Sequence, residues 1–60
     1  MDWVTFLSVM IEDEKGAIKK YRLAMEQAAS KDLKAVFERL MHEEAVHIDL
    51  LEEEVRKLQA

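Results

Sequence analysis

Glu14, Glu44 and His47 carry the oxygen and nitrogen atoms with which proteins bind transition metals. Glu44 and His47 are three residues apart, so on a helix their side chains project from one face toward one point. Carboxylate-rich ligation with one imidazole for each metal suits iron or manganese, and zinc less well. A Glu-x-x-His pair alone is weak evidence of a metal site. Further evidence must come from the way in which the secondary-structure elements bring the three residues together.

Two long amphipathic helices are the elements that hold these residues. The composition is rich in strong helix formers, with one Gly and no Pro, and apolar residues recur at helical spacing. The all-α chain is expected to form helices at about 2–29 and 31–58, joined by a turn of two to four residues that makes them antiparallel. Asp2 is the expected N-cap of the first helix, and Ser30 and Asp32 are alternative N-caps of the second. The main apolar stripes consist of Trp3, Leu7, Met10, Ala17, Tyr21, Ala24 and Ala28 on the first helix, and of Leu33, Phe37, Leu40, Leu51, Val55 and Leu58 on the second.

Glu14, Glu44 and His47 occupy the positions at which an apolar residue would continue these stripes. Unpaired carboxylates in a bundle core cost on the order of several kcal/mol each, so they need a compensating cation or a raised pKa. Glu14 lies 16 residues before Ser30, and Glu44 and His47 lie 14 and 17 residues after it. At about 1.5 Å per residue, all three sit roughly 24 Å from the turn. The three residues are therefore expected to meet at one level of the hairpin.

A single helical hairpin has no interior in which to bury its apolar stripes. A chain of 60 residues without a disulfide gains little stability from its own core, so a partner must cover the apolar surface. The simplest solution is a homodimer in which two hairpins form a four-helix bundle about a two-fold axis. The bundle would then hold four carboxylates and two imidazoles in one layer. This set fits two divalent cations, which we expect to be two iron ions per dimer, with manganese or zinc as alternatives.

The first eleven residues indicate association beyond the dimer. Their apolar side chains point all round the helix, which favours burial on more than one side. Either the dimers assemble into a larger homo-oligomer, or Phe6 and Val9 contact a partner protein. Gly16, inside the first helix, is either a tolerated surface glycine or a point of close approach by a neighbouring helix.

The composition excludes several classes of function. The absence of cysteine excludes disulfide scaffolds, zinc ribbons and thiol catalysis. The formal net charge of -4 argues against nucleic acid or an anionic membrane as a partner. No apolar run is long enough to span a bilayer, and the first residues lack the basic region of a signal peptide. These features together predict a cytoplasmic protein.

The residues around the three polar positions resemble the rubrerythrin branch of the ferritin-like di-iron superfamily. The segment 14–21, Glu-Lys-Gly-Ala-Ile-Lys-Lys-Tyr, is similar to the first metal-ligand helix of that family, and the segment 37–47, with its Phe, Leu and Glu-Glu-x-x-His, is similar to the second. The resemblance implies a ferritin-like four-helix bundle. It makes Glu14 a terminal or bridging carboxylate, Glu44 a bridging carboxylate and His47 the imidazole ligand. It also implies a catalytic role for Tyr21, whose phenol would hydrogen-bond near a ligand carboxylate.

The chain covers only half of the four-helix domain that is usual in this family. It also lacks the Cys-rich rubredoxin domain of many rubrerythrins, so electron delivery from such a domain is not expected. The closer resemblance is to half-length members that dimerise to build the site, including those packaged in encapsulin shells. An encapsulin shell is therefore a further partner that the resemblance allows, although the chain ends at Ala60, still in helix, without the targeting tail of such cargo.

Two functions are compatible with these features. The first is a di-iron oxidoreductase, either a ferroxidase or an enzyme that reduces dioxygen or peroxide. The alternative is a non-catalytic oligomerisation module, metal-stapled or metal-free, in which the three polar side chains satisfy one another through hydrogen bonds. Other charged residues near the site in sequence lie off the stripes and are expected to be solvated or at the rim: Glu12, His42, Glu43 and the run Glu52–Glu54.

Overall fold

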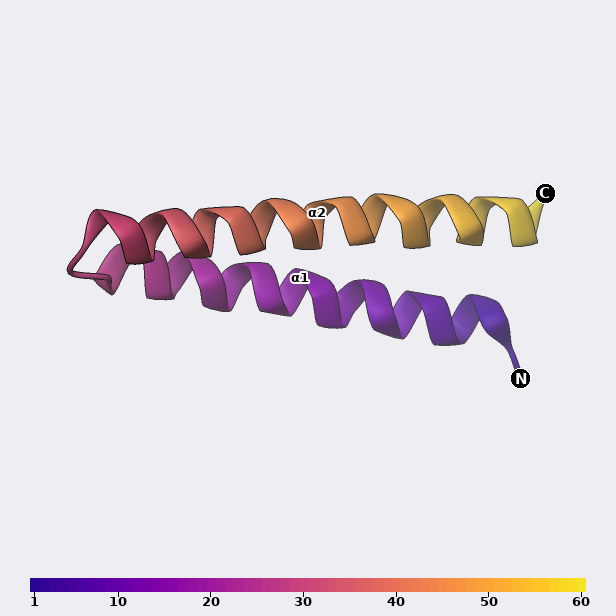
Figure 1. Ribbon diagram of the computed structural model, residues 1–60. Helices are drawn as coiled ribbons and strands as arrows, with labels where there is room; N and C mark the ends of the chain where they lie inside the picture. Colours follow the sequence, from indigo (N-terminus) through magenta and orange to yellow (C-terminus); the bar gives the residue numbers. More distant parts are fainter.

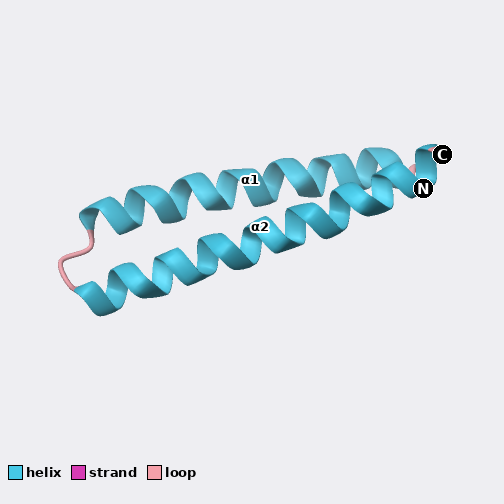
Figure 2. Ribbon diagram, turned by 90° about the horizontal axis from the view of Figure 1, so that it is seen from above, coloured by secondary structure: helices cyan, strands magenta, loops and turns pink.

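The computed structural model describes residues 1–60 and contains two α-helices and no strand. Helices α1 (Trp3–Gln27) and α2 (Lys31–Gln59) lie side by side in opposite directions (Figure 1). The turn is at one end of the hairpin, and both chain termini are at the other (Figure 2). The Cα atoms extend over 45 × 14 × 13 Å. The all-α antiparallel hairpin expected from the sequence is therefore confirmed.

Side-chain caps determine where both helices begin. Asp2 accepts a hydrogen bond from the backbone amide of Thr5, and Ser30 accepts one from the amide of Leu33, each at 3.1 Å. These bonds satisfy backbone donors that have no partner within the first helical turn. The hydrogen bond from the Thr5 amide lowers the pKa of the Asp2 carboxyl below its usual value. Asp32, the alternative cap, instead lies in the first turn of α2, where its carboxylate faces the positive end of the helix dipole.

The observed helix boundaries differ slightly from the expected ones. Helix α1 ends at Gln27 rather than at 29, because Ala28 adopts an extended backbone conformation with φ −67° and ψ 132°. Helix α2 continues one residue past 58, to Gln59. The turn between the helices comprises residues 28–30, within the expected length of two to four residues.

Replacing the cap of α2 should destabilise the hairpin measurably. We expect Ser30→Ala to lower the free energy of unfolding by about 1 kcal/mol, because the amide of Leu33 loses its acceptor. Urea unfolding followed by far-UV circular dichroism, at fixed protein concentration, measures this loss. Ser30→Asp is the matched control, since aspartate also caps helices. A destabilisation of equal size in both variants would show that the cap is not the cause.

The hairpin has almost no interior of its own. Ile11 is the single buried residue, at 8% exposure, and the accessible surface is 4741 Å². A compact globular protein of 7.0 kDa exposes about 4,000 Å², so the hairpin exposes roughly 700 Å² more than that. This excess is close to the roughly 800 Å² that each partner buries in a standard protein–protein interface. The expected lack of an interior is confirmed.

Two further expectations concern the surface of the helices. A Cβ atom added to Gly16 would meet no other atom within 4 Å, so no part of the same chain approaches this glycine closely. An approach by a second chain stays a prediction. Neither helix combines the length and the apolar character that crossing a membrane requires.

One side of the hairpin, here called the His47 face, is largely apolar. Its central hollow of about 320 Å³ is lined by Met10, Glu14, His47, Leu50 and Leu51. Further residues reach the same side at helical spacings of three, four, seven, eleven or fourteen from this group. They are the exposed Trp3, Phe6, Leu33, Val36 and Leu58 and the small Ala17 and Ala24.

The opposite side of the hairpin, here called the charged face, has a different lining. Its two hollows, of about 510 and 350 Å³, are lined by ionisable side chains, Arg22, Glu26, Lys34, His42 and Asp49, together with the apolar Ile18, Met25, Met41, Ala45 and Val46. Charged side chains are stable in contact with water, whereas contiguous large apolar ones are not. Six of the ten exposed large apolar residues belong to the His47 face: Trp3, Phe6, Leu33, Val36, Leu50 and Leu58. This face therefore has the greater need of cover by a partner.

Candidate metal centre

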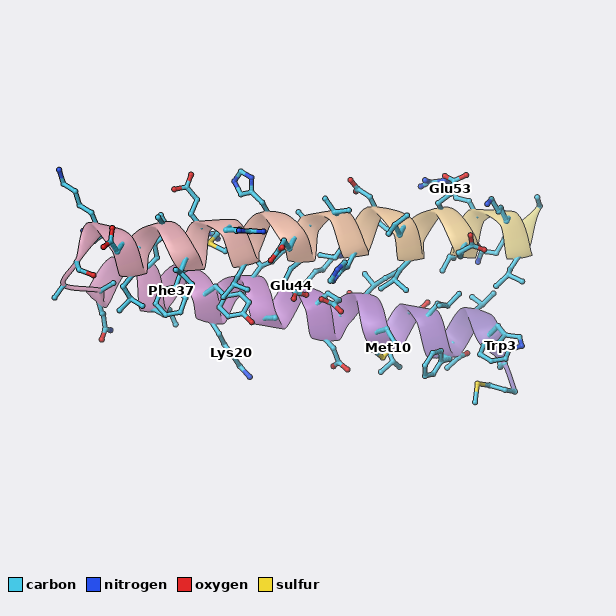
Figure 3. All side chains as sticks on the ribbon, viewed as in Figure 1. Trp3, Met10, Lys20, Phe37, Glu44 and Glu53 are labelled. Carbon is cyan, nitrogen blue, oxygen red and sulfur yellow. The ribbon has the colours of Figure 1, made fainter.

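The hairpin brings Glu14, Glu44 and His47 together, as the equal spacing from the turn predicts. One ligand atom of each residue lies within 4.8 Å of the other two, and no other group of three such residues does so in the chain. Glu14 comes from α1, and Glu44 and His47 come from successive turns of α2. Figure 3 shows Glu44 between the two helices, on the side of α2 that faces α1, about midway along the hairpin.

The distances within this trio are suited to an ion between the side chains. Nδ1 of His47 lies 3.7 Å from Oε2 of Glu14 and 3.8 Å from Oε2 of Glu44. Both separations are too long for a hydrogen bond, whose usual length is about 2.7–3.2 Å. Two metal–ligand bonds of about 2.1 Å can join atoms up to roughly 4.2 Å apart, so a cation fits between the imidazole and each carboxylate.

The two carboxylates are held in the contact between the helices. Their side chains are 21% exposed for Glu14 and 17% exposed for Glu44. Oε2 of Glu44 is fully buried and has no hydrogen-bond partner. A buried carboxylate oxygen without a partner is costly, and a metal ion is one of the few groups that compensate it. The donor set and the orphaned oxygen therefore fit a divalent cation.

His47 lies at the edge of this contact rather than inside it. Its side chain is 53% exposed, on the His47 face, and only the ring edge with Nδ1 approaches the carboxylates. In a single hairpin the trio therefore opens on one side, toward the hollow lined by Met10, Leu50 and Leu51. The sequence stripes contained Met10 and Leu51 but not Leu50. Leu50 could have been assigned to this side from the sequence, because it follows His47 by three residues on the same helix.

Glu12, His42 and Glu43 are exposed and lie outside the trio, as expected. Glu12 pairs with Lys15, and Glu43 pairs with Arg39, each at 3.7 Å. His42 is exposed and borders a hollow of the charged face.

Two glutamates of the acidic run near the end of α2, Glu53 and Glu54, form ion pairs outside the trio. Arg56 donates a hydrogen bond of 2.6 Å to Glu53, and Lys57 donates one of 3.3 Å to Glu54. The bond from Arg56 lowers the pKa of the Glu53 carboxyl below its usual value and raises that of the guanidinium. These are exposed pairs on the helix surface and contribute little to stability.

Tyr21 is outside the trio in the single chain. Its ring stacks on Phe37, with centroids 6.2 Å apart and an angle of 27° between the ring planes. Its hydroxyl makes no hydrogen bond within the chain. Tyr21 lies seven residues from Glu14, or about 10 Å along the helix axis, and side chains of a helix lean toward its N-terminus. A hydrogen bond from the phenol near a ligand carboxylate stays a prediction.

Comparison of the chain with protein-family models, with curated proteins and with solved structures finds no match. The resemblance to the rubrerythrin branch therefore rests on the residues at positions 14–21 and 37–47 alone.

Proposed function

We propose that this chain is one half of a di-iron carboxylate protein whose metal site is shared across a homodimer, with ferroxidase or dioxygen- or peroxide-reducing activity. One observation carries the proposal. Glu14, Glu44 and His47 converge within 4.8 Å, and a buried carboxylate oxygen in that group has no partner. Neither feature is needed to stabilise a helical hairpin, and both favour a bound cation.

The number of donors in one chain explains why the proposal includes a second copy. Two carboxylates and one imidazole are too few to hold two ions away from water. A second copy on the His47 face would double the set to four carboxylates and two imidazoles. It would also cover the half-exposed ring of His47 and the exposed apolar side chains around it.

Each part of the trio has a distinct role in this proposal. Glu14 and Glu44 provide negative charge in a poorly solvated position, which suits a divalent ion and its oxidised form. His47 donates Nδ1 and sits beside the apolar hollow, so Met10, Leu50 and Leu51 would limit the access of water. A pair of ferrous ions held by these residues would supply the two electrons for the reduction of dioxygen or peroxide. Tyr21 would donate its phenol hydrogen bond to a ligand carboxylate.

A second function has one observation in its favour. Nδ1 of His47 lies nearly equidistant from the two carboxylates, so a protonated imidazole would act as an internal counter-ion. The trio would then stabilise a metal-free helical oligomer without any chemistry. Manganese or zinc in place of iron would give the related case of a metal-stapled oligomer.

Anaerobic titration with ferrous ion, followed by exposure to air, distinguishes the two functions. A di-iron centre is expected to bind iron tightly and then to develop oxo-to-iron absorbance, whereas a structural oligomer should do neither. His47→Ala is expected to lose both signals. His42→Ala is the matched control, because His42 is an exposed histidine of the same helix that borders the charged face. Unchanged iron binding in His47→Ala, or its loss in His42→Ala, would contradict the assignment of the site.

A further inference from the structure

The His47 face of α2 has a mirrored sequence pattern. Its midpoint lies between Ala45 and Val46, and three pairs of identical apolar residues stand at equal distances before and after that point, whereas Leu50 corresponds to Met41 of the charged face. Leu33 matches Leu58, Leu40 matches Leu51 and Val36 matches Val55, while Glu44 and His47 flank the midpoint. A helix packed antiparallel against a copy of itself brings such equidistant positions opposite each other. The pattern of α2 is therefore self-complementary.

Helix α1 also has a midpoint with paired positions on either side, but each pair combines a large residue with a small one. Its midpoint, just before Glu14, is at the level of the midpoint of α2, because Glu14 meets Glu44 and His47 there. At equal distances from it, Met10 corresponds to Ala17 and Trp3 corresponds to Ala24. Trp3 is 55% exposed on its own hairpin, so its ring is free to pack against another chain. A bulky side chain opposite an alanine fills the space between two helices without a void.

We infer that a second copy docks on the His47 face head to tail, with α1 against the partner's α1 and α2 against the partner's α2. The two-fold axis then runs across the hairpin at the level of Glu14, Glu44 and His47. Met10 packs on the partner's Ala17, Leu40 packs on the partner's Leu51, and the two open trios face each other across the axis. This inference deepens the proposed function by giving the orientation of the partner, but the mirrored pattern supports a self-interface whether or not a metal binds.

The other two-fold arrangement places the turns of both copies at the same end. Helix α1 would then lie against the partner's α2, with Met10 opposite the partner's Leu50 and Trp3 opposite the partner's Leu58. The large side chains of both copies would crowd the open end. At the turn end, Ala17 and Ala24 would face the partner's Glu43 and Val36 and leave unfilled space. Packing density therefore favours the head-to-tail dimer.

Engineered disulfides test the orientation directly, because the chain contains no cysteine. Met10→Cys/Ala17→Cys places two thiols on one helix about 10 Å apart along its axis. That separation exceeds the roughly 7 Å Cα distance that a disulfide tolerates, so these thiols can pair only between chains. Oxidation with diamide, followed by a non-reducing gel, should convert most of the chains into a covalent dimer. Leu40→Cys/Leu51→Cys tests the same orientation on α2, and circular dichroism verifies that each variant is helical.

The matched control is Ala24→Cys/Val36→Cys, which links chains only if the turns lie at the same end. A covalent dimer from this pair, or none from either head-to-tail pair in helical protein, would overturn the inference. Iron binding is measured on the wild-type protein in parallel. Head-to-tail linkage without iron binding would overturn the metal function and leave the interface. Iron binding with linkage only through Ala24 and Val36 would overturn the orientation and leave the metal function.

Discussion

Iron is expected to saturate this protein at one ion per chain, which is two per dimer. In the proposed dimer each chain would contribute only Glu14, Glu44 and His47, so a complete pair of ions would need both copies. Because the full site would exist only in the dimer, metal binding and association are thermodynamically linked. Diluting the apo-protein should dissociate it at a higher concentration than the metallated protein. Anaerobic titration gives the stoichiometry, and sedimentation velocity over a dilution series gives the linkage.

Mixed dimers make this prediction specific to a shared site. A dimer of one Glu14→Ala chain and one His47→Ala chain keeps one copy of each altered position and both Glu44 side chains. It should therefore bind iron more tightly than the His47→Ala homodimer, which has no imidazole in the site. Glu12→Ala is a suitable control for Glu14→Ala, since Glu12 pairs with Lys15 on the surface. Saturation at two ions per chain, or equal loss of iron in both dimers, would show that the site is not shared.

Replacing Glu44 should abolish the stabilisation of the protein by metal without destabilising the apo-protein. The side chain of Glu44 is 17% exposed, and its Oε2 has no hydrogen-bond partner, so it costs free energy when no cation is bound. In the proposed dimer, repulsion between the carboxylates of the two copies would add to that cost. Glu44→Ala is therefore expected to match or exceed the wild type in stability without metal. At 100 times its dissociation constant, metal should stabilise the wild type by about 2.7 kcal/mol and this variant by nothing.

Chemical unfolding with and without metal measures both parts of this prediction. Glu43→Ala is the matched control, because Glu43 is the neighbouring glutamate and pairs with Arg39 outside the site. It should keep the stabilisation by metal. Glu44→Gln retains the shape of the side chain and separates the loss of charge from the loss of packing. An apo-protein clearly less stable in both Glu44 variants would indicate that Glu44 has a structural role in the hairpin rather than a ligand role.

The level at which the polar residues meet could be predicted from the sequence alone. Helix rise is constant, so equal numbers of residues from a short turn give equal heights in an antiparallel pair. The two helices could be predicted from the periodicity of the apolar residues, and their caps at Asp2 and Ser30 from local hydrogen bonding. Such features depend only on residues that are close together in the sequence, so the sequence is sufficient to predict them.

Tertiary packing decided what local patterns leave open. Ser30 and Asp32 were equivalent as caps until the path of the turn placed Asp32 within the first turn of α2. A stripe of apolar residues also does not specify which part of it faces the neighbouring helix, because the rotation of each helix about its axis depends on packing. That rotation places Glu14 and Glu44, about one fifth exposed, in the contact between the helices and leaves His47 half exposed on the largely apolar side. It thereby determines on which side of the hairpin the trio is open.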